Sequence, residues 1–236
     1  MSTSIRTLVR DALRIVEKDL RIERATGVVT TQIVPFGIVM LLLFGFGVDP
    51  ELQVRGGERS VLAEVAPGLF WITVLLALLL VVGRAFAVEA DDGSLDALLV
   101  SGVHPSSILA GKALVVAAEL VVLELVVGAG AMLMFDIRID DPLHLLLVVC
   151  STTAALAGAG TLFLAVVAGQ RGRDTLGPLL VLPAMAPVLI GATAATGDAL
   201  YGSGAGGAAW TWALVAFALL YFVAGIVGAG ALLEDV

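Results

Sequence analysis

Two glutamates are the first candidates for chemistry, because they interrupt a long apolar stretch. Glu119 and Glu124 lie within residues 113–135, which carry no other charged side chain. Along a helix they would lie about 10 and 18 Å from Lys112, and a charge at the centre of a membrane helix costs about 2.5–3.5 kcal/mol. Being five positions apart, they do not share one helix face. We expect at least one, and Glu124 above all, to point into a bundle or a subunit interface. For Glu119 the alternative is a shifted span that leaves it near the headgroups.

The other reactive side chains form no arrangement typical of catalysis. The single Cys150 excludes an intramolecular disulfide and a multi-cysteine metal cage. The sequence also lacks the Gly-x-x-x-x-Gly-Lys-Ser/Thr loop of P-loop ATPases. Two separate glutamates and two histidines give little support for an intramembrane enzyme. We therefore expect a protein that is not an enzyme and has no metal site.

The composition of the chain indicates whether these residues lie in water or in a membrane. The chain has 236 residues, of which 59% are apolar and 14% charged, and a mean hydropathy of +1.05. These values exclude an ordinary soluble domain, and the net charge of −8 argues against nucleic-acid binding. The apolar runs do not alternate as barrel strands do. We predict an all-α integral membrane protein, with residues 1–236 forming one domain of six transmembrane helices at about 28–47, 67–88, 113–135, 143–168, 176–196 and 209–232.

The basic residues predict the orientation of these spans. Of the thirteen Lys and Arg residues, only Arg55, Arg59 and Arg138 lie on one predicted face. The positive-inside rule then places both termini and the opposite face in the cytoplasm. The tryptophans fall at predicted span ends, where anchoring at the membrane interface is the default: Trp71, Trp210 and Trp212.

The segment before the first span, residues 1–27, predicts an amphipathic helix on the cytoplasmic side. Apolar residues recur at helical spacing along one stripe, and basic residues lie on the other side. We expect this helix to lie in the membrane interface, attracted by anionic lipid. The alternative is a soluble helix packed on a partner. The stripe comprises Ile5, Leu8, Val9, Ala12, Leu13, Val16 and Leu20, and the basic residues are Arg6, Arg10, Arg14, Lys18 and Arg21.

Residues 89–112 form the most informative polar segment. Ser94 can cap a short helix that Gly102 ends, and Pro105 can begin the next helix. The short helix would have an apolar face and acidic flanks, which favours docking into a groove on a soluble protein over lying on the bilayer surface. The predicted docking residues are Glu89, Asp91, Asp92, Ser94, Leu95, Asp96, Leu98 and Leu99.

The fifth predicted span contains three prolines: Pro178, Pro183 and Pro187. Pro183 and Pro187 each remove a backbone hydrogen bond, so we expect a kinked or broken helix. Residues 178–191 are therefore our candidate gating or re-entrant element, with a statically bent packing helix as the alternative.

Four stretches of this sequence resemble one known family. They are Lys18-Asp-Leu-Arg-Ile-Glu23, Ala66-Pro-Gly-Leu-Phe-Trp-Ile-Thr-Val-Leu-Leu-Ala77, Asp92-Gly-Ser-Leu-Asp-Ala-Leu-Leu99 and Leu182-Pro-Ala-Met-Ala-Pro-Val-Leu-Ile-Gly191. In this order and spacing they resemble the haem exporter protein B family of ABC-transporter permeases, which serves the cytochrome c maturation system. The match is weaker in the third span and in the Gly-rich loop 197–208, and Gly83-Arg84-Ala-Phe86 departs from the more acidic and aromatic pattern that the family implies there.

The resemblance implies a six-helix permease subunit of the cell inner (plasma) membrane. Its cytoplasmic loop would dock on a separate A-type ABC ATPase, beside a C-type haem-handling membrane subunit, a small D-type subunit and a periplasmic haem chaperone. Haem would be a substrate, and ATP would act through the partner subunit. A permease for a lipid or drug, and a scaffold that conducts nothing, are the alternatives. Histidine is a common haem ligand, which makes His144 on the outer face a candidate haem or chaperone contact. His104 lies on the wrong side for periplasmic delivery.

Overall fold

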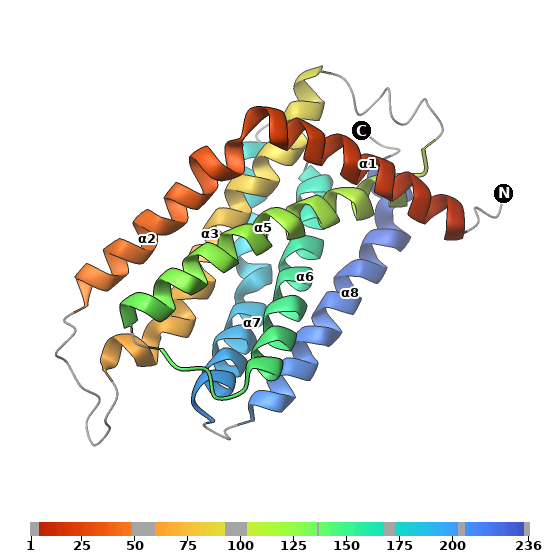
Figure 1. The fold of residues 1–236 in the computed structure, drawn as a ribbon. Coiled ribbons are helices and arrows are strands. Elements are labelled where there is room, and N and C mark those ends of the chain that lie inside the picture. The colour runs from red at the N-terminus through yellow and green to blue at the C-terminus, as the bar shows by residue number, and fades with distance from the viewer. Residues whose placement is uncertain are drawn as a thin grey trace.

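A bundle of long helices crossed at one end by a further helix makes up the protein (Figure 1). The structure is a computed structural model that describes residues 5–48, 60–92, 103–135, 137–167, 173–202 and 206–233. Nearly all of these residues are helical, which confirms the predicted all-α class. The elements are α1 (Ile5–Thr26), the π-helical turn η1 (Val29–Ile33), α2 (Val34–Gly47), α3 (Val61–Asp92), α5 (Pro105–Phe135), α6 (Pro142–Val167), α7 (Arg173–Tyr201) and α8 (Gly207–Leu233).

Six of the helical segments are long and apolar enough to cross a membrane. The first combines η1 with α2, and the others lie in α3, α5, α6, α7 and α8. Helices satisfy their backbone polar groups internally, which the hydrocarbon region requires. The chain is therefore a multi-pass membrane protein, as its composition predicts.

Two helices are longer than the hydropathy pattern predicts. Helix α3 begins at Val61, where Ser60 Oγ accepts a hydrogen bond from the Ala63 amide at 3.2 Å, so that Pro67 lies inside the helix. The predicted polar segment 89–112 is helical at both ends, since α3 continues to Asp92 and α5 starts at Pro105. Alanine and acidic residues are compatible with a helix, and the start of α5 is buried in the bundle. The start at Pro105 is the predicted one.

The longer α3 also corrects the prediction for Trp71. This side chain is fully buried, and its indole Nε1 donates to Thr196 Oγ1 of α7 at 2.8 Å. It lies ten residues inside α3, which begins at Val61, and it belongs to the hydrophobic core. By contrast, Trp210 and Trp212 lie in the first turns of α8 and are 37% and 71% exposed, as expected of residues near a span end.

The core lies where α3, α5, α6 and α7 pack together. Close approach depends on glycine at several crossings. Gly37 of α2 faces Leu123 of α5, which would lie 2.5 Å from an added Cβ, and Gly130 of α5 faces Leu41 of α2 at the same distance. These two glycines let α2 lie against α5.

Helix α1 lies across the end of the bundle at which α3 ends and α5 begins (Figure 1). Its Ala12 and Ile15 are buried, and it packs mainly on α5. A Cβ added to Gly111 of α5 would lie 2.8 Å from Ile15 Cβ and 3.0 Å from the Ala12 carbonyl oxygen. The absence of a side chain at Gly111 therefore allows α1 to pack directly on α5. We call this contact the Gly111 seat.

Candidate functional site

The two helices that flank the predicted docking segment, α3 and α5, can be placed in the structure. Glu89, Asp91 and Asp92 belong to the end of α3, although their side chains lie outside the described part of the structure. Ser94, Leu95, Asp96, Leu98 and Leu99 lie outside the described residues altogether. Both helices that flank this segment, α3 before it and α5 after it, reach the α1 end of the bundle (Figure 1).

Two ion pairs join α1 to these flanking helices. Arg84 of α3 contacts Glu23 of α1 at 3.1 Å, and its second guanidinium nitrogen donates to Thr26 Oγ1 at 3.1 Å. The other carboxyl oxygen of Glu23 accepts the backbone N–H of Val29 at 2.6 Å. Glu23 thus links the end of α1 to α3 and to the start of the first span.

The second ion pair is more deeply buried. Lys112 of α5 is 3% exposed, and its Nζ lies 3.7 Å from Asp19 Oδ2 of α1. Asp19 also contacts Lys18 at 3.1 Å. A buried charge requires compensation by a partner, so the Asp19–Lys112 pair ties α1 to α5.

Glu119 lies within electrostatic reach of both ion pairs. It is partly buried, and its charged neighbours are Glu23, Arg84, Asp19 and Lys112. We call Asp19, Glu23, Arg84, Lys112 and Glu119 the junction cluster. Sequence reasoning found Glu119 and missed the pairing of the other four. The available signals were Asp19 and Glu23, four positions apart on one helix face, and two basic residues placed near the cytoplasmic ends of predicted spans.

Glu124 is buried in the core, as predicted. Its two carboxyl oxygens lie 2.9 and 2.8 Å from Thr153 Oγ1 of α6, within hydrogen-bond distance. The same hydroxyl lies 2.8 Å from the Val149 carbonyl oxygen. Glu119 and Glu124 therefore have different surroundings, as their spacing predicts. Glu119 has charged neighbours in the junction cluster, whereas Glu124 contacts a neutral hydroxyl in the apolar core.

The three prolines of the fifth span lie within one uninterrupted helix. Pro178, Pro183 and Pro187 all belong to α7, which runs from Arg173 to Tyr201. The helix is therefore not broken at these prolines, and a kink at Pro183 and Pro187 stays a prediction. Each proline removes one backbone hydrogen bond, and the rest of the helix continues because α7 packs against α3, α6 and α8.

The two histidines lie at opposite ends of the bundle, and each has partners within the protein. His104 Nδ1 accepts the backbone N–H of Ser106 at 3.3 Å, so His104 caps the start of α5. His144 Nε2 lies 2.8 Å from Thr211 Oγ1 of α8, and its Nδ1 lies 3.9 Å from Asp198 Oδ2 of α7. Among the described residues there is no group of three or more His, Cys, Asp or Glu side chains that could hold a metal ion.

Comparison with known proteins identifies the family. The model of the family described as CcmB protein matches residues 10–232. The chain belongs to the CcmB family. The match begins within α1 and ends within α8, so it includes the junction cluster, Glu124 and the proline-containing helix.

Curated members of the CcmB family resemble this chain over most of its length. Heme exporter protein B of Rhodobacter capsulatus is 32% identical over 179 residues, which cover 75% of this chain and 78% of the relative. The protein of the same name from Paracoccus denitrificans is 34% identical over 73% of this chain and 76% of the relative. The Bradyrhizobium diazoefficiens protein is 30% identical over 93% of this chain and 96% of the relative.

Proposed function

We propose that this chain is the permease subunit of an ABC-type complex that exports or otherwise handles haem during the assembly of c-type cytochromes. Membership of the CcmB family supports this proposal, as do the relatives named heme exporter protein B. The described residues include six candidate membrane spans, and the sequence contains no phosphate-binding loop. ATP would therefore be hydrolysed by a separate A-type ATPase, beside a C-type haem-handling subunit, a small D-type subunit and a periplasmic chaperone. In this scheme the α1 end is cytoplasmic, in the cell inner membrane.

The proposed coupling between the ATPase and the membrane spans depends on the position of the junction cluster. The end of α3 and the segment that follows it would bind the ATPase through Asp91, Asp92 and Asp96. Any displacement of that segment acts first on the ends of α3 and α5. Those helices are joined to α1 through Arg84–Glu23 and Lys112–Asp19. Motion of the ATPase would thus reach α1 and two spans together.

Helix α7 is the proposed gating element within the bundle. Pro183 and Pro187 leave two backbone carbonyls without the usual intrahelical donor, which lowers the cost of bending the helix there. Because α7 contacts α3, a change in the α3 end could alter the bend. Replacing Pro183 and Pro187 with alanine should preserve folding and reduce haem delivery.

Charge reversal tests the docking proposal. Asp91→Lys, Asp92→Lys and Asp96→Lys, combined in one chain, should abolish co-purification of the ATPase and assembly of c-type cytochromes. A control variant, Glu64→Lys with Asp140→Lys, reverses two exposed acidic residues near the opposite end of the bundle and should retain both the ATPase and cytochrome assembly. Retention of the ATPase by the triple variant would contradict docking at this segment.

Transport in vesicles separates a conducting permease from a scaffold. The complete complex, reconstituted in proteoliposomes with ATP, should move haem across the bilayer or deliver it to the chaperone in an ATP-dependent manner. If ATP hydrolysis responds to the chaperone and no haem crosses the bilayer, a scaffold is supported and a haem conduit is contradicted. Transport of a lipid or drug in place of haem would contradict the proposed substrate.

A further inference from the structure

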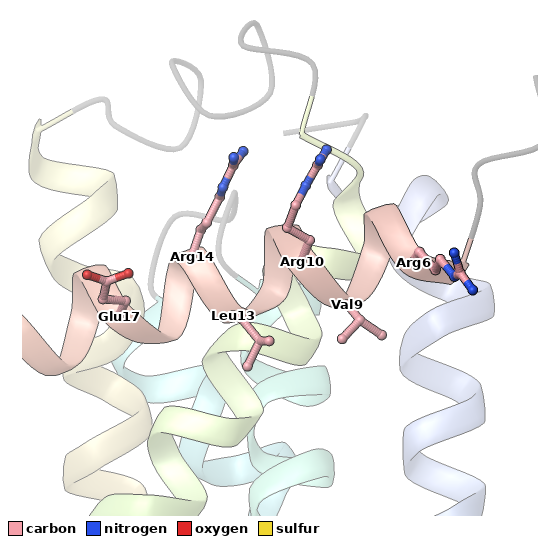
Figure 2. Close-up of a pocket in the computed structure, with 6 residues that line it drawn as sticks. All are labelled: Arg6, Val9, Arg10, Leu13, Arg14 and Glu17. Carbon is pink, nitrogen blue, oxygen red and sulfur yellow. The ribbon is translucent and has the colours of Figure 1, made fainter.

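The N-terminal half of α1 presents a mixed basic and apolar surface that the proposed coupling does not use. Arg6, Val9, Arg10, Leu13, Arg14 and Glu17 line a shallow hollow of about 500 Å³ along this helix (Figure 2). In this view Arg10 and Arg14 point away from the bundle, and Val9 and Leu13 point along the side of the spanning helices. The surface is therefore divided into a charged side and an apolar side.

The apolar side is exposed in the isolated chain. Val9 is 53% exposed and Leu13 is 57% exposed, whereas Ala12 and Ile15 are buried at the contact with α5. Leu114 of α5 is also exposed, three residues beyond the Gly111 seat. The apolar surface of the spanning helices thus begins at the level where α1 crosses them. Acyl chains that surround those helices would also cover Val9 and Leu13.

The charged side has an excess of positive charge. Arg10 and Arg14 share the Asp11 carboxylate, each at 3.6 Å, and their side chains are 61% and 69% exposed. Glu17 contacts Arg21 at 2.9 Å. The other acidic residues of α1, Asp19 and Glu23, contact Lys112 and Arg84 of the bundle. Asp11 is therefore the only acidic residue of the described helix α1 that contacts Arg10 and Arg14, and one carboxylate shared by two exposed arginines leaves a net positive charge.

We propose that the Arg6–Arg14 half of α1 is a binding site for anionic phospholipids. The arginines bind the headgroup phosphates, and Val9 and Leu13 lie among the upper acyl chains. Arginine suits this role because its planar guanidinium can form paired hydrogen bonds with phosphate. A basic helix with an apolar side is typical of binding in the plane of a membrane interface. Helix α1 thus has two binding halves, with the second half held by protein through the junction cluster and the first half held by lipid.

The experiment uses the full chain in vesicles with a fluorophore close to the proposed site. Leu13→Cys in a Cys150→Ser background is labelled with bimane and reconstituted into phosphatidylcholine vesicles that contain phosphatidylglycerol. Either lipid is supplied with brominated acyl chains at the same mole fraction. We expect stronger quenching by brominated phosphatidylglycerol than by brominated phosphatidylcholine. Equal quenching by the two lipids would overturn the lipid specificity, and absence of quenching would place Leu13 under protein or in water.

Two double variants of equal charge form the matched comparison. Arg10→Gln with Arg14→Gln should reduce the preference for phosphatidylglycerol by at least about fivefold, since a basic residue near an anionic surface contributes roughly that factor. Arg21→Gln with Arg24→Gln removes the same charge from the second half of α1 and should retain most of the preference. Equal losses in both would contradict a site in the first half.

Two further measurements test whether a lost preference reflects lost charge or misfolding, and whether the site binds free phosphate. Arg10→Lys with Arg14→Lys keeps the charge and should keep most of the lipid preference, and circular dichroism should show the same helical content in every variant. Inorganic phosphate, added at constant ionic strength, should not change the quenching. If phosphate abolishes the preference, the site binds free anions and the lipid assignment is wrong.

Discussion

Thr153 Oγ1 of α6 lies within 2.9 Å of both carboxyl oxygens of Glu124 in α5. The contact joins two spanning helices in the interior of the bundle, where both residues are buried. A polar contact between membrane helices contributes about 0.6 kcal/mol on average, so modest stabilisation alone is a weak reason to bury a carboxyl group. The contact therefore raises the question of whether Glu124 serves folding, haem handling or both.

A paired replacement at Glu124 and Thr153 separates these roles. Glu124→Leu should impair c-type cytochrome assembly, and Thr153→Val should destabilise the fold by about 1–3 kcal/mol because it leaves a buried acceptor without its donor. Combining Glu124→Leu with Thr153→Val removes both polar groups and should restore stability to near that of the unmodified chain. Stability is measured by unfolding in detergent, and function by growth that depends on c-type cytochromes.

The paired replacement has two distinct outcomes. Restored stability without restored growth supports a role for Glu124 beyond packing. Normal growth of the Glu124→Leu variant would show that the carboxyl group is not needed for function. Glu124→Gln is the conservative control, since its amide oxygen can still accept from Thr153 and should leave folding intact.

The Asp19–Lys112 pair predicts unequal effects of its two single replacements. Asp19→Asn removes the carboxylate that lies 3.7 Å from the nearly fully buried Lys112 and should destabilise the protein by more than about 1 kcal/mol. Lys112→Met removes the buried charge itself and should cost less than about 1 kcal/mol, because Asp19 retains its contact with Lys18. Unfolding in detergent measures both changes.

An exposed ion pair provides the control for this comparison. Glu17 and Arg21 lie 2.9 Å apart on the exposed side of α1. Glu17→Gln should change stability little, because exposed pairs contribute little. Equal effects of Asp19→Asn and Lys112→Met would show that burial of Lys112 does not determine the strength of the link between α1 and α5.

The sequence predicts the overall fold more completely than it predicts the contacts between the helices. Six long apolar stretches suffice to predict six helices, since lipid allows few other solutions. The boundaries of α3 were harder to predict, because polar residues such as Ser60 and Asp92 can end a span or extend a helix beyond the hydrocarbon. The burial of Trp71 follows from that boundary and from the neighbouring Thr196, and hydropathy gives no information on which helices are neighbours.

The residues of the candidate site could likewise be predicted one by one, but the contacts between them could not. Sequence reasoning identified Glu119, Glu124, His144 and the basic stripe of α1 as single features. It could not pair Lys112 with Asp19, or Glu124 with Thr153, because such pairs depend on how distant helices are packed. In the same way, α1 was predicted to have one apolar stripe. The structure divides that side between Ala12, which is buried with the neighbouring Ile15 against α5, and the exposed Val9 and Leu13.

Gly111 should be intolerant of any side chain. An added Cβ would lie 2.8 Å from Ile15 Cβ and 3.0 Å from the Ala12 backbone oxygen, so Gly111→Ala must displace α1. We expect a loss of about 1–3 kcal/mol and faster tryptic cleavage at the arginines of α1. Gly83→Ala is the matched control, because nothing lies within 4 Å of its added Cβ. Equal cleavage in the two variants would show that α1 is not seated on Gly111.

His144 provides a test of the proposed contact at the outer end of the bundle. Both ring nitrogens face protein groups, with Thr211 Oγ1 at 2.8 Å and Asp198 Oδ2 at 3.9 Å. A histidine that contacts haem or the chaperone must exchange at least one of these partners during transfer. Thr211→Val removes the 2.8 Å contact and leaves the imidazole in place, so it should preserve or increase haem transfer. His144→Ala should reduce transfer by the complete complex while the spans remain folded. If both variants reduce transfer and stability together, His144 acts by joining α6, α7 and α8, and a contact with haem or the chaperone is contradicted.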